Sequence, residues 1–119
     1  MFTDEIKKLT PYDKYIIIVE DLRNTYLFAD SAYQHGRFEI EYKIDKNVHY
    51  YLDDINTYRN KLKCDYELAL QIKDKVNQQS LDESEKKLFD LDNKLFEKIQ
   101  RLLTMMDSFL SQYNIELSV

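Results

Sequence analysis

The scarcity of glycine and proline is the feature that most constrains the fold of this chain. One residue of each type occurs among the 119 amino acids. Tight turns between strands usually need several of both, because glycine supplies positive φ angles and proline presets a bend. The sequence therefore predicts an all-α protein in which a few long helices are joined by short connections.

The clearest helical pattern lies near the C-terminus. From Leu88 to Tyr113, apolar residues recur at steps of three or four with charged residues between them, which is the spacing of one helix face. The apolar positions are Leu88, Leu91, Leu95, Ile99, Leu102, Met106, Phe109 and Tyr113. Ser80 and Glu83 have the spacing of a capping box. The pattern predicts a helix over 81–113 that buries its apolar face.

Another helix is predicted over residues 11–35. Thr10 can cap its first turn, and Pro11 suits the first helical position, where its missing N–H would have no partner. Apolar residues keep the helical step at Tyr15, Val19, Leu22, Tyr26, Ala29 and Tyr33. Gly36 follows directly after this pattern, where a left-handed C-cap favours glycine. We therefore expect the helix to end there.

The segment after Gly36 fits two structures. Apolar and charged residues alternate over 38–44, as in a half-buried strand, and a returning strand would make a β-hairpin over 38–52. The same segment also carries apolar residues at helical steps, and these continue towards residue 78. Because an isolated hairpin is only marginally stable, we favour a helix over 38–78 and keep the hairpin as the alternative.

The predicted fold is thus an antiparallel bundle of three long helices in one domain, residues 1–119. Asp65 falls on an apolar step of the middle helix, so we expect Tyr66 to take the core position there. The middle helix would be about 60 Å long, and the first helix would cover only part of it. Either it breaks near Asp45–Asn47, which gives four helices, or its uncovered part pairs with a second copy as a coiled coil.

Composition and charge narrow the classes of partner. The chain is 44% hydrophobic and 33% charged, which is typical of a soluble globular protein. Its formal net charge is -5, and its basic residues are interleaved with acids, so we expect no direct binding to nucleic acid. The longest apolar run, Tyr15–Val19, is too short to cross a membrane. No signal-peptide pattern opens the sequence, and we expect a cytoplasmic protein.

The single cysteine, Cys64, rules out an intrachain disulfide and favours a reducing compartment. It has no histidine near it in the sequence that could act as a base, so we expect a partly buried structural thiol. A high content of Lys, Ile, Asn and Tyr is typical of AT-rich genomes, which include those of many phages and mobile elements.

Tyrosine carries the main functional signal. Nine of the ten tyrosines lie between Tyr12 and Tyr66. Tyrosine is favoured in protein interfaces, because it combines a large contact area with a hydrogen-bonding tip. Several tyrosines lie off the predicted core faces and close to acids. The resulting candidate partner-binding residues are Tyr12, Glu39, Glu41, Tyr42, Tyr50, Asp53 and Asp54. We expect the partner to be another protein, with a basic groove.

Few residue patterns in the sequence point to metal binding or catalysis. His35 and Glu39, and likewise His49 and Asp53, are four residues apart and could share a helix face. These four are weak candidates for a metal site, because one such pair supplies too few ligands, and we expect no metal and no cofactor. One glycine cannot build a phosphate-binding loop. Adjacent acids on a helix point about 100° apart, so they do not form catalytic pairs, and no catalytic residue is identified.

These observations favour a non-enzymatic protein–protein interaction module. In its sharper form it is an inhibitor or immunity-type factor of a phage or mobile element, which covers the basic groove of a nucleic-acid-binding enzyme. One alternative is a structural coiled-coil protein that self-associates, at the least as a homodimer. The other is a metal-dependent helical-bundle enzyme that uses the two His–acid pairs.

Overall fold

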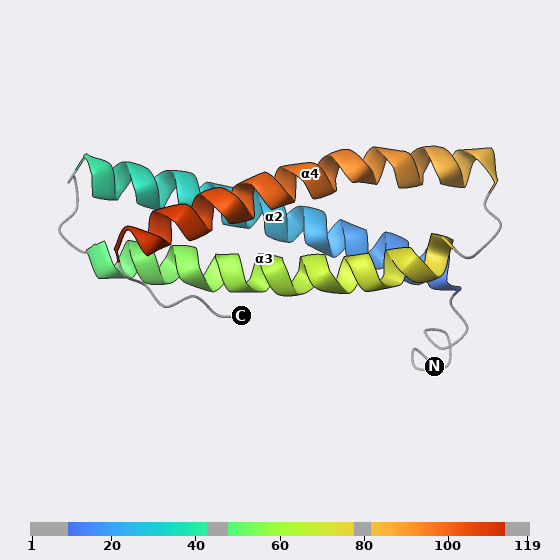
Figure 1. Ribbon diagram of the computed structural model, residues 1–119, viewed down its shortest axis with the longest axis horizontal. Coiled ribbons are helices and arrows are strands. Elements are labelled where there is room, and N and C mark those ends of the chain that lie inside the picture. The colour runs from blue at the N-terminus through green and yellow to red at the C-terminus, as the bar shows by residue number, and fades with distance from the viewer. Residues whose placement is uncertain (1–9, 43–47, 78–81, 114–119) are drawn as a thin grey trace.

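The computed structural model describes residues 10–42, 48–77 and 82–113, and within these ranges it contains three helices and no strand (Figure 1). Helix α2 spans Pro11–Glu41, α3 spans Val48–Asn77 and α4 spans Glu83–Ser111. The chain runs back and forth along the long axis, so consecutive helices are antiparallel. The predicted all-α bundle of three long helices is therefore confirmed.

The start of α2 agrees with the sequence. The Thr10 hydroxyl accepts a hydrogen bond from the Asp13 backbone N–H at 3.1 Å, and the Asp13 carboxylate accepts one from the Thr10 N–H at 3.2 Å. Pro11 occupies the first helical position. This reciprocal capping box satisfies two N–H groups that would otherwise have no partner in the helix.

The end of α2 does not agree with the sequence, because the helix continues through Gly36 to Glu41. Gly36 is buried inside α2, where an added Cβ would lie 2.8 Å from Ile55 Cδ1 and 3.5 Å from Tyr51 Cβ. The glycine therefore allows α3 to approach α2 closely. The prediction that it caps the helix is wrong.

This correction changes the middle of the bundle. Residues 38–41 belong to α2, and α3 begins only at Val48, so the predicted continuous helix over 38–78 is wrong at its start. Residues 38–41 and 48–52 are helical and form no hairpin. The predicted break near Asp45–Asn47 lies outside the described residues. Since α2 and α3 have nearly equal lengths, 31 and 30 residues, no long stretch of α3 extends beyond α2.

Helix α4 begins two residues later than the proposed Ser80–Glu83 capping box implies. Asp82 is its N-cap, its side chain accepts from the Glu85 N–H at 2.8 Å, and Glu85 accepts in return from the Asp82 N–H at 3.1 Å. The cap predicted at Ser80 is therefore wrong, although Ser80 itself lies outside the described residues. Asp82 and Glu85 have the same spacing as that pair and provide the same reciprocal bonds.

The core lies along the axis where the three helices meet. Its most deeply buried side chains come from all three helices: Tyr15, Leu22, Ala29, Ile55, Leu62, Ala69, Val76, Ile99, Leu102, Met106 and Leu110. Tyr66 is also buried, as predicted, while the partly buried Asp65 accepts a hydrogen bond from the Thr25 hydroxyl at 2.8 Å.

The buried face of α4 is rotated relative to the predicted one. Leu91 is 58% exposed and Tyr113 is also exposed, whereas Phe96 and Leu110, which were not predicted, are buried. The partly buried side chain in this part of α4 is Asp92. The prediction was wrong at both ends of the stripe. At the N-terminal end the partly buried position carries Asp92, and at the C-terminal end Leu110 is buried while Tyr113 is exposed.

Candidate functional site

Two tyrosines lie on either side of the connection between α2 and α3, and both are largely exposed. Tyr42, the C-cap of α2, is 67% exposed, and Tyr50, in the first turn of α3, is 60% exposed. Tyrosine side chains are enriched in protein interfaces.

Neighbouring rings support both tyrosines. The Phe38 and Tyr42 ring centroids are 4.7 Å apart on α2. On α3 the Tyr50 ring meets the edge of Tyr51 at 5.2 Å, and Tyr51 in turn meets His35 of α2 at 5.7 Å. Each exposed tyrosine ring therefore packs against at least one neighbouring ring.

Carboxylates lie on the same two helix ends. Glu41 is exposed and forms an ion pair with Arg37 at 3.8 Å, one turn earlier. Glu39 and Asp54 are partly exposed, and Asp53 is exposed. Within the described part of the chain, no lysine or arginine forms an ion pair with Glu39, Asp53 or Asp54. Their negative charge is thus not neutralised by a neighbouring cation of the described structure.

We call this set the aromatic–acidic surface. It consists of Glu39, Glu41, Tyr42, Tyr50, Asp53 and Asp54. The fold brings these six predicted residues to one end of the bundle, because α2 ends and α3 begins there (Figure 1).

Tyr12 does not belong to this surface. It lies in the first turn of α2, at the other end of the helix, and is only 9% exposed. Burial and the nearby carboxylates of Glu85 and Asp82 raise the pKa of its hydroxyl. The prediction that Tyr12 lies on an exposed face is therefore wrong.

The weak metal candidates are distributed over two helices. His35 and Glu39 share α2, which is continuous through Gly36, and His49 and Asp53 share α3. Among the described residues, no three His, Cys, Asp or Glu side chains form a group that could hold a metal ion. Cys64 is exposed, so the prediction that its thiol is partly buried is wrong.

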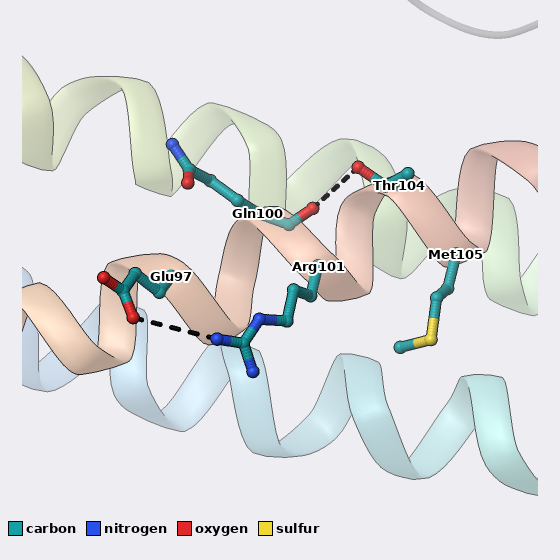
Figure 2. Close-up of a pocket in the computed structure, with 5 residues that line it drawn as sticks. All are labelled: Glu97, Gln100, Arg101, Thr104 and Met105. Atoms are coloured by element: carbon teal, nitrogen blue, oxygen red, sulfur yellow. Dashed lines mark hydrogen bonds and ion pairs between the residues drawn. The ribbon is translucent and has the colours of Figure 1, made fainter.

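A shallow depression of about 470 Å³ lies on α4 and is drawn in Figure 2. Glu97 and Arg101 pair at 3.8 Å on one side of it, and the Thr104 hydroxyl donates to the Gln100 carbonyl at 2.9 Å on the other. The Thr104 hydroxyl bonds a backbone carbonyl, and the five lining residues include no nucleophile bonded to an adjacent base.

Sequence reasoning missed a charged contact between α2 and α4. Asp92 of α4 lies 3.5 Å from the Arg23 guanidinium of α2, and only 13% of its side chain is exposed. Burial raises the pKa of Asp92, while the Tyr15 hydroxyl and the charges of Arg23 and Lys73 oppose that rise. An alternative helical stripe through Phe96, Ile99, Met106 and Leu110 leads back to Asp92, and that is the signal that could have located it.

A second charged contact, between α3 and α4, was also missed. Arg59 is 5% exposed, and its Nε donates to Asp107 Oδ1 at 2.6 Å while Nη2 reaches Asp107 Oδ2 at 3.4 Å. The Nη1 group donates to the Asn60 side chain at 3.1 Å. Such a two-pronged bond is geometrically specific. Both charged contacts hold α4 in position, so we assign them to structure.

Within the described residues, no helix combines the length and the apolarity needed to cross a lipid bilayer. Comparison with family models, with curated proteins and with solved structures gives no significant match to this chain.

Proposed function

We propose that this chain is a protein-binding module that contacts its partner through the aromatic–acidic surface. One observation carries the proposal: Tyr42 and Tyr50 are each at least 60% exposed, and they lie on the same end of the bundle as carboxylates without a described cationic partner. A buried tyrosine ring contributes large apolar area, and unpaired carboxylates select for positive charge.

The partner is therefore a protein with a basic surface that also holds apolar pockets for the two rings. A nucleic-acid-binding enzyme is one class of protein with such a groove, and an inhibitor that covers it would use this combination of acids and tyrosines. Electrostatic attraction between exposed charges weakens as salt rises, because the Debye length falls from about 10 Å at 0.1 M to about 3 Å at 1 M.

The test compares capture by three versions of the chain from lysates of candidate hosts. The double variant Tyr42→Ser/Tyr50→Ser removes both rings and is expected to lose a partner that wild type retains. Leu68→Ser is the matched control, because Leu68 is an exposed apolar residue on α3 outside the surface. Circular dichroism establishes that all three chains are equally helical.

The charge component is tested separately with Asp53→Asn/Asp54→Asn. We expect this variant to bind the same partner more weakly at low salt and to show a shallower salt dependence. The proposal fails if the tyrosine variant and the Leu68 control capture the same proteins to the same extent.

A further inference from the structure

The outer face of α2, which points away from the core, carries an unusual amount of apolar surface. Ile17, Leu27, Phe28 and Phe38 are each at least half exposed, and Ile16 is 43% exposed. We define these five residues as the outer face of α2. Exposed apolar residues scattered singly need no explanation, but these five form three groups along one face of the helix, with exposed polar residues between the groups.

The spacing of these residues is regular. Ile16, Leu27 and Phe38 are eleven residues apart, and so are Ile17 and Phe28. Eleven residues make close to three full turns, so residues at that spacing lie almost in line along a helix. The outer face therefore presents three apolar patches, which we call ridges: Ile16 and Ile17 at one end, Leu27 and Phe28 in the middle, and Phe38 at the other end.

The ridges are arranged so that the face complements itself. In an antiparallel pair, a register that places Leu27 opposite Phe28 of a second copy also places Ile17 opposite Phe38. Both contacts occur twice, which is the property of an interface with twofold symmetry. We propose that the outer face of α2 binds a second copy of this chain, antiparallel, about a twofold axis near Leu27 and Phe28.

The polar residues between the ridges fit the same register. Glu20 falls opposite His35, Asp21 falls opposite Gln34, and Asn24 falls opposite Ser31. All six of these residues are exposed. No like charges oppose each other in these pairs, whereas a parallel pair in register would place Glu20 beside Glu20 and Asp21 beside Asp21. Like charges directly opposed disfavour an interface, so the charge pattern selects the antiparallel arrangement.

The available area suits a weak dimer. Helix α2 has 31 residues, and at about 1.5 Å per residue it is about 46 Å long. A strip of that length and about 10 Å width offers on the order of 450 Å² per copy, or about 900 Å² in total, which is slightly below the roughly 1,000 Å² expected of a specific, stable interface. The pairing therefore depends on protein concentration. It uses Phe38, whose ring packs against Tyr42, and the same register places Ile16 opposite Glu39, so the dimer face borders the proposed partner surface.

Sedimentation equilibrium over a concentration series tests the dimer. We expect wild type to dimerise, and Leu27→Glu to weaken the dimer roughly tenfold or more, because two glutamates then meet near the twofold axis. Leu68→Glu, an exposed apolar site on α3, is the matched control and should dimerise like wild type. A wild-type chain that stays monomeric throughout, or an equal effect of the two glutamates, overturns the proposal.

The register is tested by exchanging charge. Ile17→Lys alone and Phe38→Glu alone should each weaken the dimer, while Ile17→Lys/Phe38→Glu in one chain should restore it, because each lysine then faces a glutamate of the other copy. Circular dichroism establishes that the variants keep their helices. If the double variant is no stronger than either single variant, the antiparallel register is wrong.

Discussion

The bundle has two seams: the contact between α2 and α3, and the contact of α4 with that pair. The two seams differ in the kinds of side chain that form them. Between α2 and α3, Gly36 lets the backbones approach, Leu22, Ile55 and Leu62 are fully buried, and the partly buried Asp65 accepts a hydrogen bond from the neutral Thr25 hydroxyl. Helix α4 also buries apolar side chains, but charged contacts lie at both ends of its seam, at Asp92 and at Asp107. Apolar packing tolerates many small adjustments, whereas a paired charge accepts few positions. The difference indicates that charge fixes how α4 is placed on a largely apolar helix pair.

The largest expected effect tests the charged seam at Asp107. Asp107→Ala removes the two hydrogen bonds that the Asp107 carboxylate accepts from the buried Arg59 guanidinium, and we expect a loss of about 2–3 kcal/mol in the free energy of unfolding, measured with urea. The double variant Arg59→Met/Asp107→Leu removes both charges and should recover most of that loss, because no buried charge is left unpaired.

The control for this experiment is Glu97→Ala, which breaks the exposed pair with Arg101 and should cost no more than about 0.5 kcal/mol. If Asp107→Ala costs as little as this control, charge does not fix α4, and the contrast between the two seams collapses.

A smaller effect is expected in the seam between α2 and α3. Gly36→Ala adds a Cβ 2.8 Å from Ile55 Cδ1, which offsets the gain in helix propensity, and Ile55→Val removes that methyl group. In a double-mutant cycle measured by urea unfolding, we expect a favourable coupling of at least about 0.5 kcal/mol. Gly36→Ala combined with Ile99→Val on α4 should be additive, and coupling of equal size there would show that close approach at Gly36 is not the cause.

The smallest effect is a pH dependence at Asp92. Burial raises the pKa of this carboxyl in the folded protein, so the folded state holds the proton more strongly than the unfolded state. Its contribution to stability is therefore greatest at low pH and falls as pH rises from the unfolded pKa of about 3.9 through the folded value.

Asp92→Asn removes this titration while keeping the shape of the side chain. We expect the unfolding free energy of the variant relative to wild type to increase as pH rises above 4. A difference that stays constant with pH, or that changes in the opposite direction, contradicts the assignment of this carboxyl to a desolvated position.

The sequence predicted most residues of the candidate site, but it did not predict which of them the other helices would cover. Tyr42 and Tyr50 were predicted off the core faces because neither continues an apolar stripe, and both are exposed. Tyr12 fitted the same description and is buried, because the bundle covers the first turn of α2. Periodicity shows which residues share a face, but which faces are covered depends on where the other helices lie.

The sequence by itself determined that the chain is helical, where α2 starts, and that α3 and α4 return along it. These properties come from local chemistry: capping side chains, apolar steps of three and four, and the scarcity of turn residues. Only the tertiary structure decided that Gly36 lies inside a helix, and that Asp92 and Arg59 lie in seams rather than in solvent. From the sequence alone, Gly36 is interpreted as a helix cap and Asp92 and Arg59 as surface charges. Their actual contacts come from residues distant in the chain, so the sequence pattern does not show them.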